Sequence, residues 1–177
     1  TVPSASKEEV DLCLEYAQKG KKEWGGTPLH LRTELLKKCA EALREHKTEL
    51  AALLSRETGK PIIQSEFDIE GAIFHLMAFA EKAKHIYGDV MPDFAPGYEK
   101  DIVFTRREPL GVVACIIPFN YPPPICINKI APALATGNAV IIKPSSSNPL
   151  TVIRMVEIML ECGIPANALQ IITGHGA

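Results

Sequence analysis

The sequence lacks the motifs that mark several well-known classes of enzyme. Over its 177 residues it has no G-x-G-x-x-G loop after a strand, no phosphate-binding P-loop and no G-x-S-x-G nucleophile motif. Its five histidines are scattered, and no set of His, Cys, Asp and Glu has the spacing of a metal site. We therefore expect no bound metal ion.

Excess positive charge and long apolar runs are also missing. The net charge is −2, whereas affinity for nucleic acid comes mostly from clustered Lys and Arg, so we expect no nucleic-acid partner. The longest apolar candidate, Val112–Ile117, ends at Pro118 and is far shorter than the roughly 18 residues of a membrane helix. The polar start of the chain does not resemble a signal peptide. We expect no membrane association, and the absence of Met at Thr1 suggests that further residues precede it.

Paired cysteines are absent as well. The five cysteines are odd in number and form no C-x-x-C motif. Four of them lie in apolar stretches, as reduced buried thiols do: Cys13, Cys39, Cys115 and Cys162. Reduced thiols are typical of a reducing compartment, so we expect a cytoplasmic protein.

What the sequence does contain begins with amphipathic helices over residues 1–88. Ser6–Glu9 forms an S-x-x-E capping box at the start of the first helix. Thr27-Pro28 predicts the N-cap and first turn of the next one. A stripe of leucines then predicts one long helix or a helix pair that ends at Gly59, and a further helix is expected over residues 64–86.

Residues 89–108 break the helical pattern. Pro92, Pro96 and Gly97 predict turns, and residues 101–106 read as an extended segment. From these residues alone, the segment is a linker or a plain two-stranded connector.

Residues 109–177 alternate between strand and helix. Strands are predicted over 112–117, 139–142 and 169–172, and right-handed crossovers would make them parallel neighbours in one sheet. The first strand is apolar throughout, as expected when both faces of a sheet are covered. A helix is expected over 125–134, and Asn148-Pro149 predicts the cap and first position of a second one. This βαβαβ unit is half of a doubly wound α/β fold.

Polar residues stand where two of these strands end, which is where ligands bind in open α/β sheets. Asn120 follows the first strand, and its amide could donate a hydrogen bond to an oxygen that becomes negative during a reaction. It could equally stabilise a turn through its own backbone. Lys143 ends the second strand and suits ribose hydroxyls or phosphate, although an ordinary surface lysine before a serine-rich loop fits the pattern as well.

An ordered set of segments in the chain closely resembles the NAD(P)-dependent aldehyde dehydrogenase superfamily. The resemblance covers nearly the whole chain and matches the N-terminal part of such an enzyme. The matching segments are Glu57-Thr58-Gly59-Lys60-Pro61, Arg107–Val112, Pro118-Phe119-Asn120-Tyr121-Pro122, Lys129–Asn138, Lys143-Pro144-Ser145 and Ile171-Ile172-Thr173-Gly174. The resemblance implies an α/β fold in which N-terminal helices precede the first half of a Rossmann-like parallel sheet. It also implies that residues 89–108 form an oligomerisation segment of a homo-oligomer, a dimer or a tetramer.

The resemblance assigns roles to eight residues. It makes Asn120 the catalytic donor to the oxyanion of a thiohemiacetal, and it makes the remaining seven cofactor-binding residues. Ile117, Pro118 and Phe119 would help to form the nicotinamide pocket, Lys143, Ser145 and Ser146 would hold the adenosine ribose, and Gly174 would lie against the adenine.

The implied function is oxidation of a small-molecule aldehyde to a carboxylic acid or acyl product, with hydride transfer to NAD or NADP. Ser146 stands where many members of the superfamily have a Glu that grips both ribose hydroxyls. A short neutral side chain there removes repulsion toward a 2′-phosphate, which makes NADP plausible. The superfamily's nucleophilic Cys and its catalytic domain have no counterpart in this chain, which we therefore expect to be an inactive fragment. The alternative is a non-catalytic module for dinucleotide binding or oligomerisation.

Overall fold

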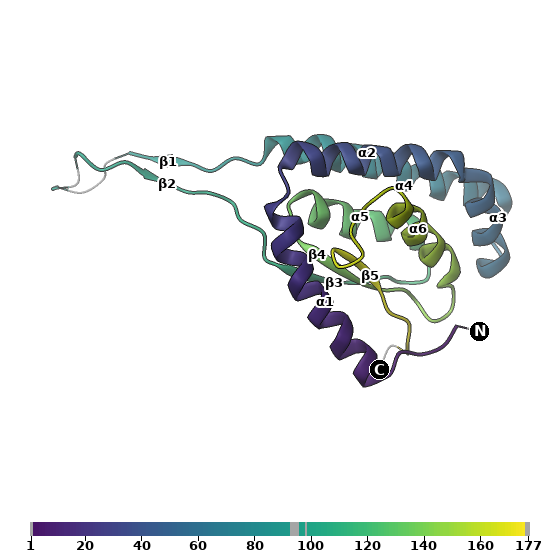
Figure 1. Ribbon diagram of the computed structural model, residues 1–177. Coiled ribbons are helices and arrows are strands. Elements are labelled where there is room, and N and C mark those ends of the chain that lie inside the picture. Colours follow the sequence, from purple (N-terminus) through teal and green to yellow (C-terminus); the bar gives the residue numbers. More distant parts are fainter. Residues whose placement is uncertain (1, 93–95, 98, 176–177) are drawn as a thin grey trace.

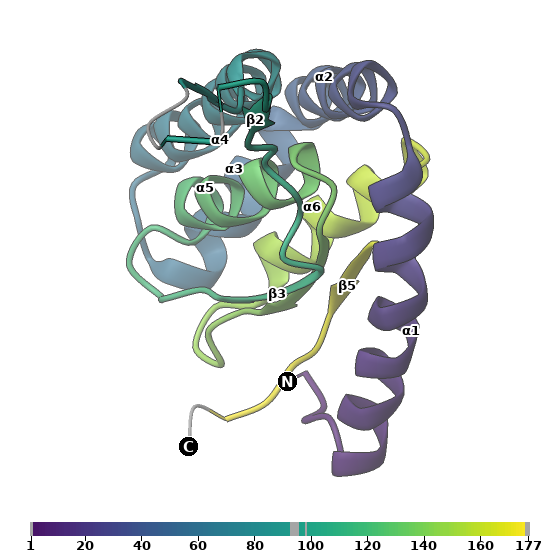
Figure 2. The same cartoon turned by 90° about the vertical axis from the view of Figure 1, so that its left-hand side faces the viewer.

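The computed structural model describes residues 2–92, 96–97 and 99–175, and it has the predicted α/β fold (Figures 1 and 2). One face of a parallel sheet is covered by α1, and the other by α5 and α6. The remaining helices, α2 to α4, pack on the outer side of α5 and α6. The helices span Lys7–Gly26 (α1), Leu29–Glu45 (α2), Lys47–Thr58 (α3), Ile62–Lys82 (α4), Pro122–Ala135 (α5) and Leu150–Glu161 (α6), with a 3-10 turn, η1, at Ala83–His85.

The sheet confirms the predicted parallel strands. Its order is β3 (Val112–Ile116), β4 (Ala139–Lys143) and β5 (Leu169–Ile171), and all pairs are parallel. Ile116 pairs with Lys143, and the register continues beyond β3, because the Ile117 N–H donates to the Lys143 carbonyl at 2.9 Å. The three loops that follow these strands therefore leave the sheet at the same edge.

The N-terminal helices form where the hydrophobic pattern placed them. The capping box at Ser6 is confirmed, since its hydroxyl accepts from Glu9 N and the Glu9 carboxylate accepts from Ser6 N. The leucine stripe forms a helix pair, α2 and α3. The N-cap prediction for Thr27 is wrong: its N–H donates to Trp24 O, so it ends α1, and Pro28 stands before the first residue of α2.

Two predictions about β3 and α5 need correction. α5 begins at Pro122, three residues earlier than expected, because the first turn of a helix needs no N–H donors and therefore accepts proline. β3 is not covered on both faces within the described residues. α1 packs mainly against β4, and Ile116 on the open face of β3 is 66% exposed.

The described residues of the segment 89–108 form a hairpin arm that extends away from the body of the molecule (Figure 1). β1 (Val90–Met91) pairs antiparallel with β2 (Val103–Phe104). The apolar side chains of the arm are open to solvent, with Val90 77% and Phe104 69% exposed. Part of the predicted segment, residues 93–95 and 98, lies outside the described residues.

The main core lies between the sheet and the helices above it. It joins side chains of α2, α3 and α4 to those of β4, α5 and α6, so residues 1–88 and 109–175 share one core. A smaller cluster under α1 contains Cys13, Ala17, Ala139 and Ile141. Within the described residues, no helix is long and apolar enough to cross a bilayer.

The contact of α1 with the rest of the fold depends on a glycine. A Cβ at Gly20 would lie 1.9 Å from the backbone oxygen of Asn167, so α1 and the loop before β5 approach too closely for any side chain. At Gly26, in the last turn of the same helix, a Cβ would meet nothing within 4 Å.

We expect Gly20→Ala to lower the free energy of unfolding by about 1–3 kcal/mol or more, the range for overpacking in a tight contact. Gly26→Ala is the matched control and should be neutral or slightly stabilising, because Ala is the better helix former. Urea unfolding followed by the fluorescence of the buried Trp24 measures both variants. Equal stabilities of the two variants would contradict the packing of α1 described here.

Candidate functional site

Three loops meet at the carboxyl edge of the sheet. Residues 117–121 follow β3, residues 144–149 follow β4, and residues 172–175 follow β5. The loop after β4 lies between two cavities, because its residues line both of them. All of the predicted site residues lie in these loops or at the ends of the strands before them.

The first cavity, called here the serine cavity, has a volume of about 290 Å³. Three predicted site residues line it together: Ser145, Ser146 and Gly174. The N-terminal residues Val2–Ser4 form another wall, and His175 also lines the cavity. None of the described lining residues is acidic, so the serine cavity can accept an anionic group without repulsion.

The second cavity, called here the asparagine cavity, has a volume of about 300 Å³ and lies on the other side of the β4–α6 loop. Phe119 and Asn120 line it, as do Ser147 and Asn148 of that loop. Its remaining lining residues come from a distant segment, the end of α3 and the connection that follows it: Glu57, Thr58 and Lys60. Asn120 is exposed at this cavity.

The other predicted site residues differ in how much they expose. Lys143 is half-buried at the end of β4, and in the described part of the chain its ammonium donates only to Pro144 O, at 3.2 Å. Pro118 and Phe119 are exposed. Ile117 is 2% exposed, so any contact of Ile117 with a ligand would have to use its backbone.

The start of α6 contradicts the predicted Asn148 cap. Pro149 occupies the N-cap position, and the Asn148 amide donates to Phe119 O at 2.7 Å. The free N–H groups of α6 are satisfied by Glu57, whose carboxylate accepts from Leu150 N at 2.8 Å and from Thr151 N at 3.0 Å. A carboxylate at a helix N-terminus also interacts favourably with the helix dipole. This helix start is therefore already occupied and is closed to a phosphate group.

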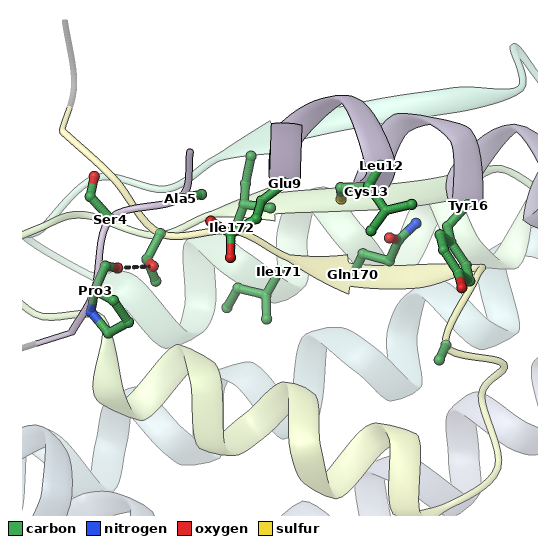
Figure 3. Close-up of a pocket in the computed structure, with 12 residues that line it drawn as sticks. Pro3, Ser4, Ala5, Glu9, Leu12, Cys13, Tyr16, Gln170, Ile171 and Ile172 are labelled. Carbon is green, nitrogen blue, oxygen red and sulfur yellow. Dashed lines mark hydrogen bonds between the residues drawn. The ribbon is translucent and has the colours of Figure 1, made fainter. Parts of the chain in front are cut away.

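A cavity of about 460 Å³, larger than these two, lies elsewhere. It runs along the unpaired edge of β5 beneath α1, and Leu12, Cys13 and Tyr16 point into it from the helix (Figure 3). Gln170 and Ile171 line it from the strand (Figure 3). None of the eight predicted site residues contributes to its lining. We attribute this cavity to the uncovered edge of the sheet and propose no catalytic role for it.

The cysteines are unsuited to nucleophilic catalysis. All five are free and buried. Burial raises the pKa of the Cys13, Cys39 and Cys126 thiols and raises that of Cys115 to about 11. A nucleophilic cysteine needs the thiolate, which burial in apolar surroundings disfavours. No group of three or more His, Cys, Asp and Glu gathers as a metal site within the part of the chain that the structure describes.

Sequence reasoning missed Glu57, Lys60 and Asn148 as contributors to this edge of the sheet. In the sequence, the Glu57–Pro61 segment is explained by the end of a helix at Gly59. That explanation holds for Gly59, which ends α3 with a φ of 74°. The charged residues on either side of this glycine, Glu57 and Lys60, could have indicated a contribution to the site, because helix termination requires neither charge.

Comparisons with known proteins agree with this architecture. A family model described as the aldehyde dehydrogenase family matches residues 1–177. A 3-sulfolactaldehyde dehydrogenase of Priestia aryabhattai is 38% identical over 174 residues, which are 98% of this chain and 36% of that protein. The chain thus spans about a third of the length of the curated relatives it matches.

Solved structures give the same result. The NADP-dependent glyceraldehyde-3-phosphate dehydrogenase of Bacillus halodurans C-125, complexed with NADP, is 36% identical with a TM-score of 0.96, over 99% of this chain and 37% of that one. PnpE of Pseudomonas sp. WBC-3, in complex with nicotinamide adenine dinucleotide, is 35% identical with a TM-score of 0.93, over 99% of this chain and 35% of that one.

We expect Glu57→Ala to lower the free energy of unfolding by about 1–2 kcal/mol, because it leaves two N–H groups of α6 without their acceptor. Inorganic phosphate should then stabilise the Glu57→Ala variant more than the unchanged protein, since it can occupy the vacated helix start. Thermal unfolding with and without phosphate measures both effects. A Glu57→Ala variant as stable as the parent would show that the cap contributes nothing.

Proposed function

The chain belongs to the aldehyde dehydrogenase family, and we propose that it supplies the NAD(P)-binding part of an enzyme that oxidises an aldehyde to a carboxylic acid or acyl product. The observation that carries the proposal is the β4–α6 loop with its two cavities. Ser145 and Ser146 line one cavity, while the next residues of the same loop line the cavity that holds Asn120. A dinucleotide is long enough to have its two ends in different cavities.

The serine cavity fits the adenosine end of the cofactor. Lys143 precedes the lining residue Pro144 and is not itself part of the lining. It uses one N–H on Pro144 O, and an ammonium has three, so two donors remain for ribose hydroxyls. The hydroxyls of Ser145 and Ser146 and the absence of acidic groups among the described lining residues suit a 2′-phosphate as well. A Cβ at Gly174 would approach Ser4 Oγ to 3.2 Å, so a glycine keeps this wall flat for a base.

Asn120 fits the role of a donor to a developing oxyanion. Its amide lies at the carboxyl edge of the sheet, where the chain bends between β3 and α5. A hydrogen bond from a fixed amide strengthens as negative charge appears on the substrate oxygen, which lowers the barrier more than it aids ground-state binding. NAD(P), when bound, supplies the acceptor for the hydride of the aldehyde.

The nucleophile belongs to a segment outside this chain. The buried thiols described above are unsuited to attack on a carbonyl, and none of the five lines the serine cavity or the asparagine cavity. Activity therefore requires the full-length protein, and we propose that this chain alone is inactive.

The hairpin arm is the proposed contact with a second copy of the protein. Its exposed apolar side chains project from the body, and apolar surface of this kind marks protein–protein contacts. The proposed homo-oligomer, a dimer or a tetramer, would bury Val90 and Phe104.

In the full-length protein, Asn120→Ala should lower kcat by about 10²- to 10³-fold while leaving the Kd of the cofactor almost unchanged. Lys143→Ala should do the reverse and weaken cofactor binding by about 10- to 100-fold, because ribose contacts are alike in the ground and transition states. Steady-state kinetics and fluorescence titration of the cofactor separate the two effects. Loss of stability alone, with both parameters intact per folded molecule, would show that the assigned roles are wrong.

Ser146→Glu should shift cofactor preference from NADP toward NAD, because the new carboxylate repels a 2′-phosphate and can accept from the ribose hydroxyls of NAD. The ratio of kcat/KM for the two cofactors measures the shift, with Ser147→Glu as the control on the neighbouring residue. A ratio that moves equally in both variants would point to a general charge effect instead.

A further inference from the structure

The direction of the Asn120 side chain depends on two peptide planes. The peptide between Phe119 and Asn120 precedes its Cα, and the peptide between Asn120 and Tyr121 follows it. Each plane is rigid, so φ and ψ of Asn120 are the soft rotations between them. Holding both carbonyl oxygens therefore fixes the direction of the Asn120 Cα–Cβ bond.

Two side chains hold these two oxygens. Lys60 donates from its ammonium to Asn120 O at 2.8 Å. Asn148 donates from its amide to Phe119 O at 2.7 Å. These two residues, called here the Asn120 clamp, come from different parts of the chain and converge on one exposed bend.

Lys60 is itself firmly held. Its ammonium contacts the Asp68 carboxylate at 2.6 Å, and the two side chains are only 20% and 10% exposed, the least exposed ion pair in the described part of the chain. Its backbone is fixed on both sides, because Lys60 N donates to Thr58 Oγ1 and Lys60 O accepts from Ser55 Oγ. A charge-assisted bond from such an anchored donor is stronger and better oriented than one from a free surface lysine.

Three groups of the protein surround the ammonium of Lys60. Two of its N–H groups go to Asp68 and to Asn120 O, and the nitrogen lies 4.1 Å from the centroid of the Tyr121 ring. Through this cation–π contact Lys60 also interacts with the residue after Asn120. These contacts tie Lys60 to the bend.

We propose that Lys60 is a positioning residue, which together with Asn148 fixes the peptide planes around Asn120 so that its amide points at the reacting oxygen. The proposal rests on the function proposed above for Asn120. A misplacement of about 1 Å in such a group can lower a rate by about 10²-fold, so holding the bend has a direct effect on turnover.

The test uses Lys60→Met in the full-length protein, with Lys60→Arg as the conservative variant. Lys47→Met is the matched control, because Lys47 of α3 pairs at 2.9 Å with Glu70 of α4, the helix that also carries Asp68, and does not contact the bend. We expect Lys60→Met to lower kcat by about 10- to 100-fold with an unchanged cofactor Kd. Lys60→Arg should recover most of the loss, and Lys47→Met should retain full kcat.

A double mutant separates positioning from general destabilisation. If Lys60 acts through Asn120, then Lys60→Met should lower kcat less than twofold further when Asn120 is already Ala. An equal loss in both backgrounds would overturn the proposal. The Asn120→Ala variant alone tests the proposed function, so full activity there would refute that function and not the clamp.

The Asn120 clamp can also be tested by proteolysis, without measuring enzymatic activity. Phe119 is 66% exposed, so chymotrypsin can cleave the Phe119–Asn120 bond when the bend loosens. Mass spectrometry should detect faster cleavage at this bond in Lys60→Met than in Lys47→Met at equal unfolding midpoints. Equal cleavage rates would show that Lys60 does not hold the bend.

Discussion

Parallel pairing of β3, β4 and β5 is the constraint on which the candidate site depends. Parallel strands end at the same edge, and the bond from Ile117 N to Lys143 O carries this register into the loops. Asn120 and Lys143 are 23 positions apart in sequence, yet both leave the sheet at this edge. The strands are short, so their register is maintained mainly by burial of β4 between α1 and α5.

Polar groups from the end of α3 and from the α3–α4 connection complete the edge. Glu57 satisfies the first N–H groups of α6, and Lys60 holds the bend at Asn120. Occupation of the α6 start by a carboxylate has a functional consequence. In many dinucleotide-binding folds a helix N-terminus takes the diphosphate, whereas we propose that here other groups bind it and that the Lys143–Ser146 segment binds the adenosine end.

The sequence was informative where the signal is local. Apolar runs bounded by Gly and Pro predicted the three parallel strands, and the capping box at Ser6 predicted the start of α1. Contacts between distant residues were not predictable in this way. Glu57 and its partner Thr151 are 94 positions apart. The Asn148 amide donates to Phe119 O and does not cap the adjacent helix. Neither contact can be recognised from a local sequence pattern. The sequence did not predict the exposed face of β3, because an apolar strand has the same sequence pattern whether one or both of its faces are covered.

We propose that the β4–α6 loop places the adenosine end of the cofactor on its serine side and leaves Asn120 free on the other. A crystal structure of the full-length protein with NADP would test this placement. We expect a ribose hydroxyl within hydrogen-bond distance of Lys143, the 2′-phosphate beside Ser146, and Glu57 still bonded to the start of α6. A diphosphate bound at the start of α6 in place of the Glu57 carboxylate would contradict it.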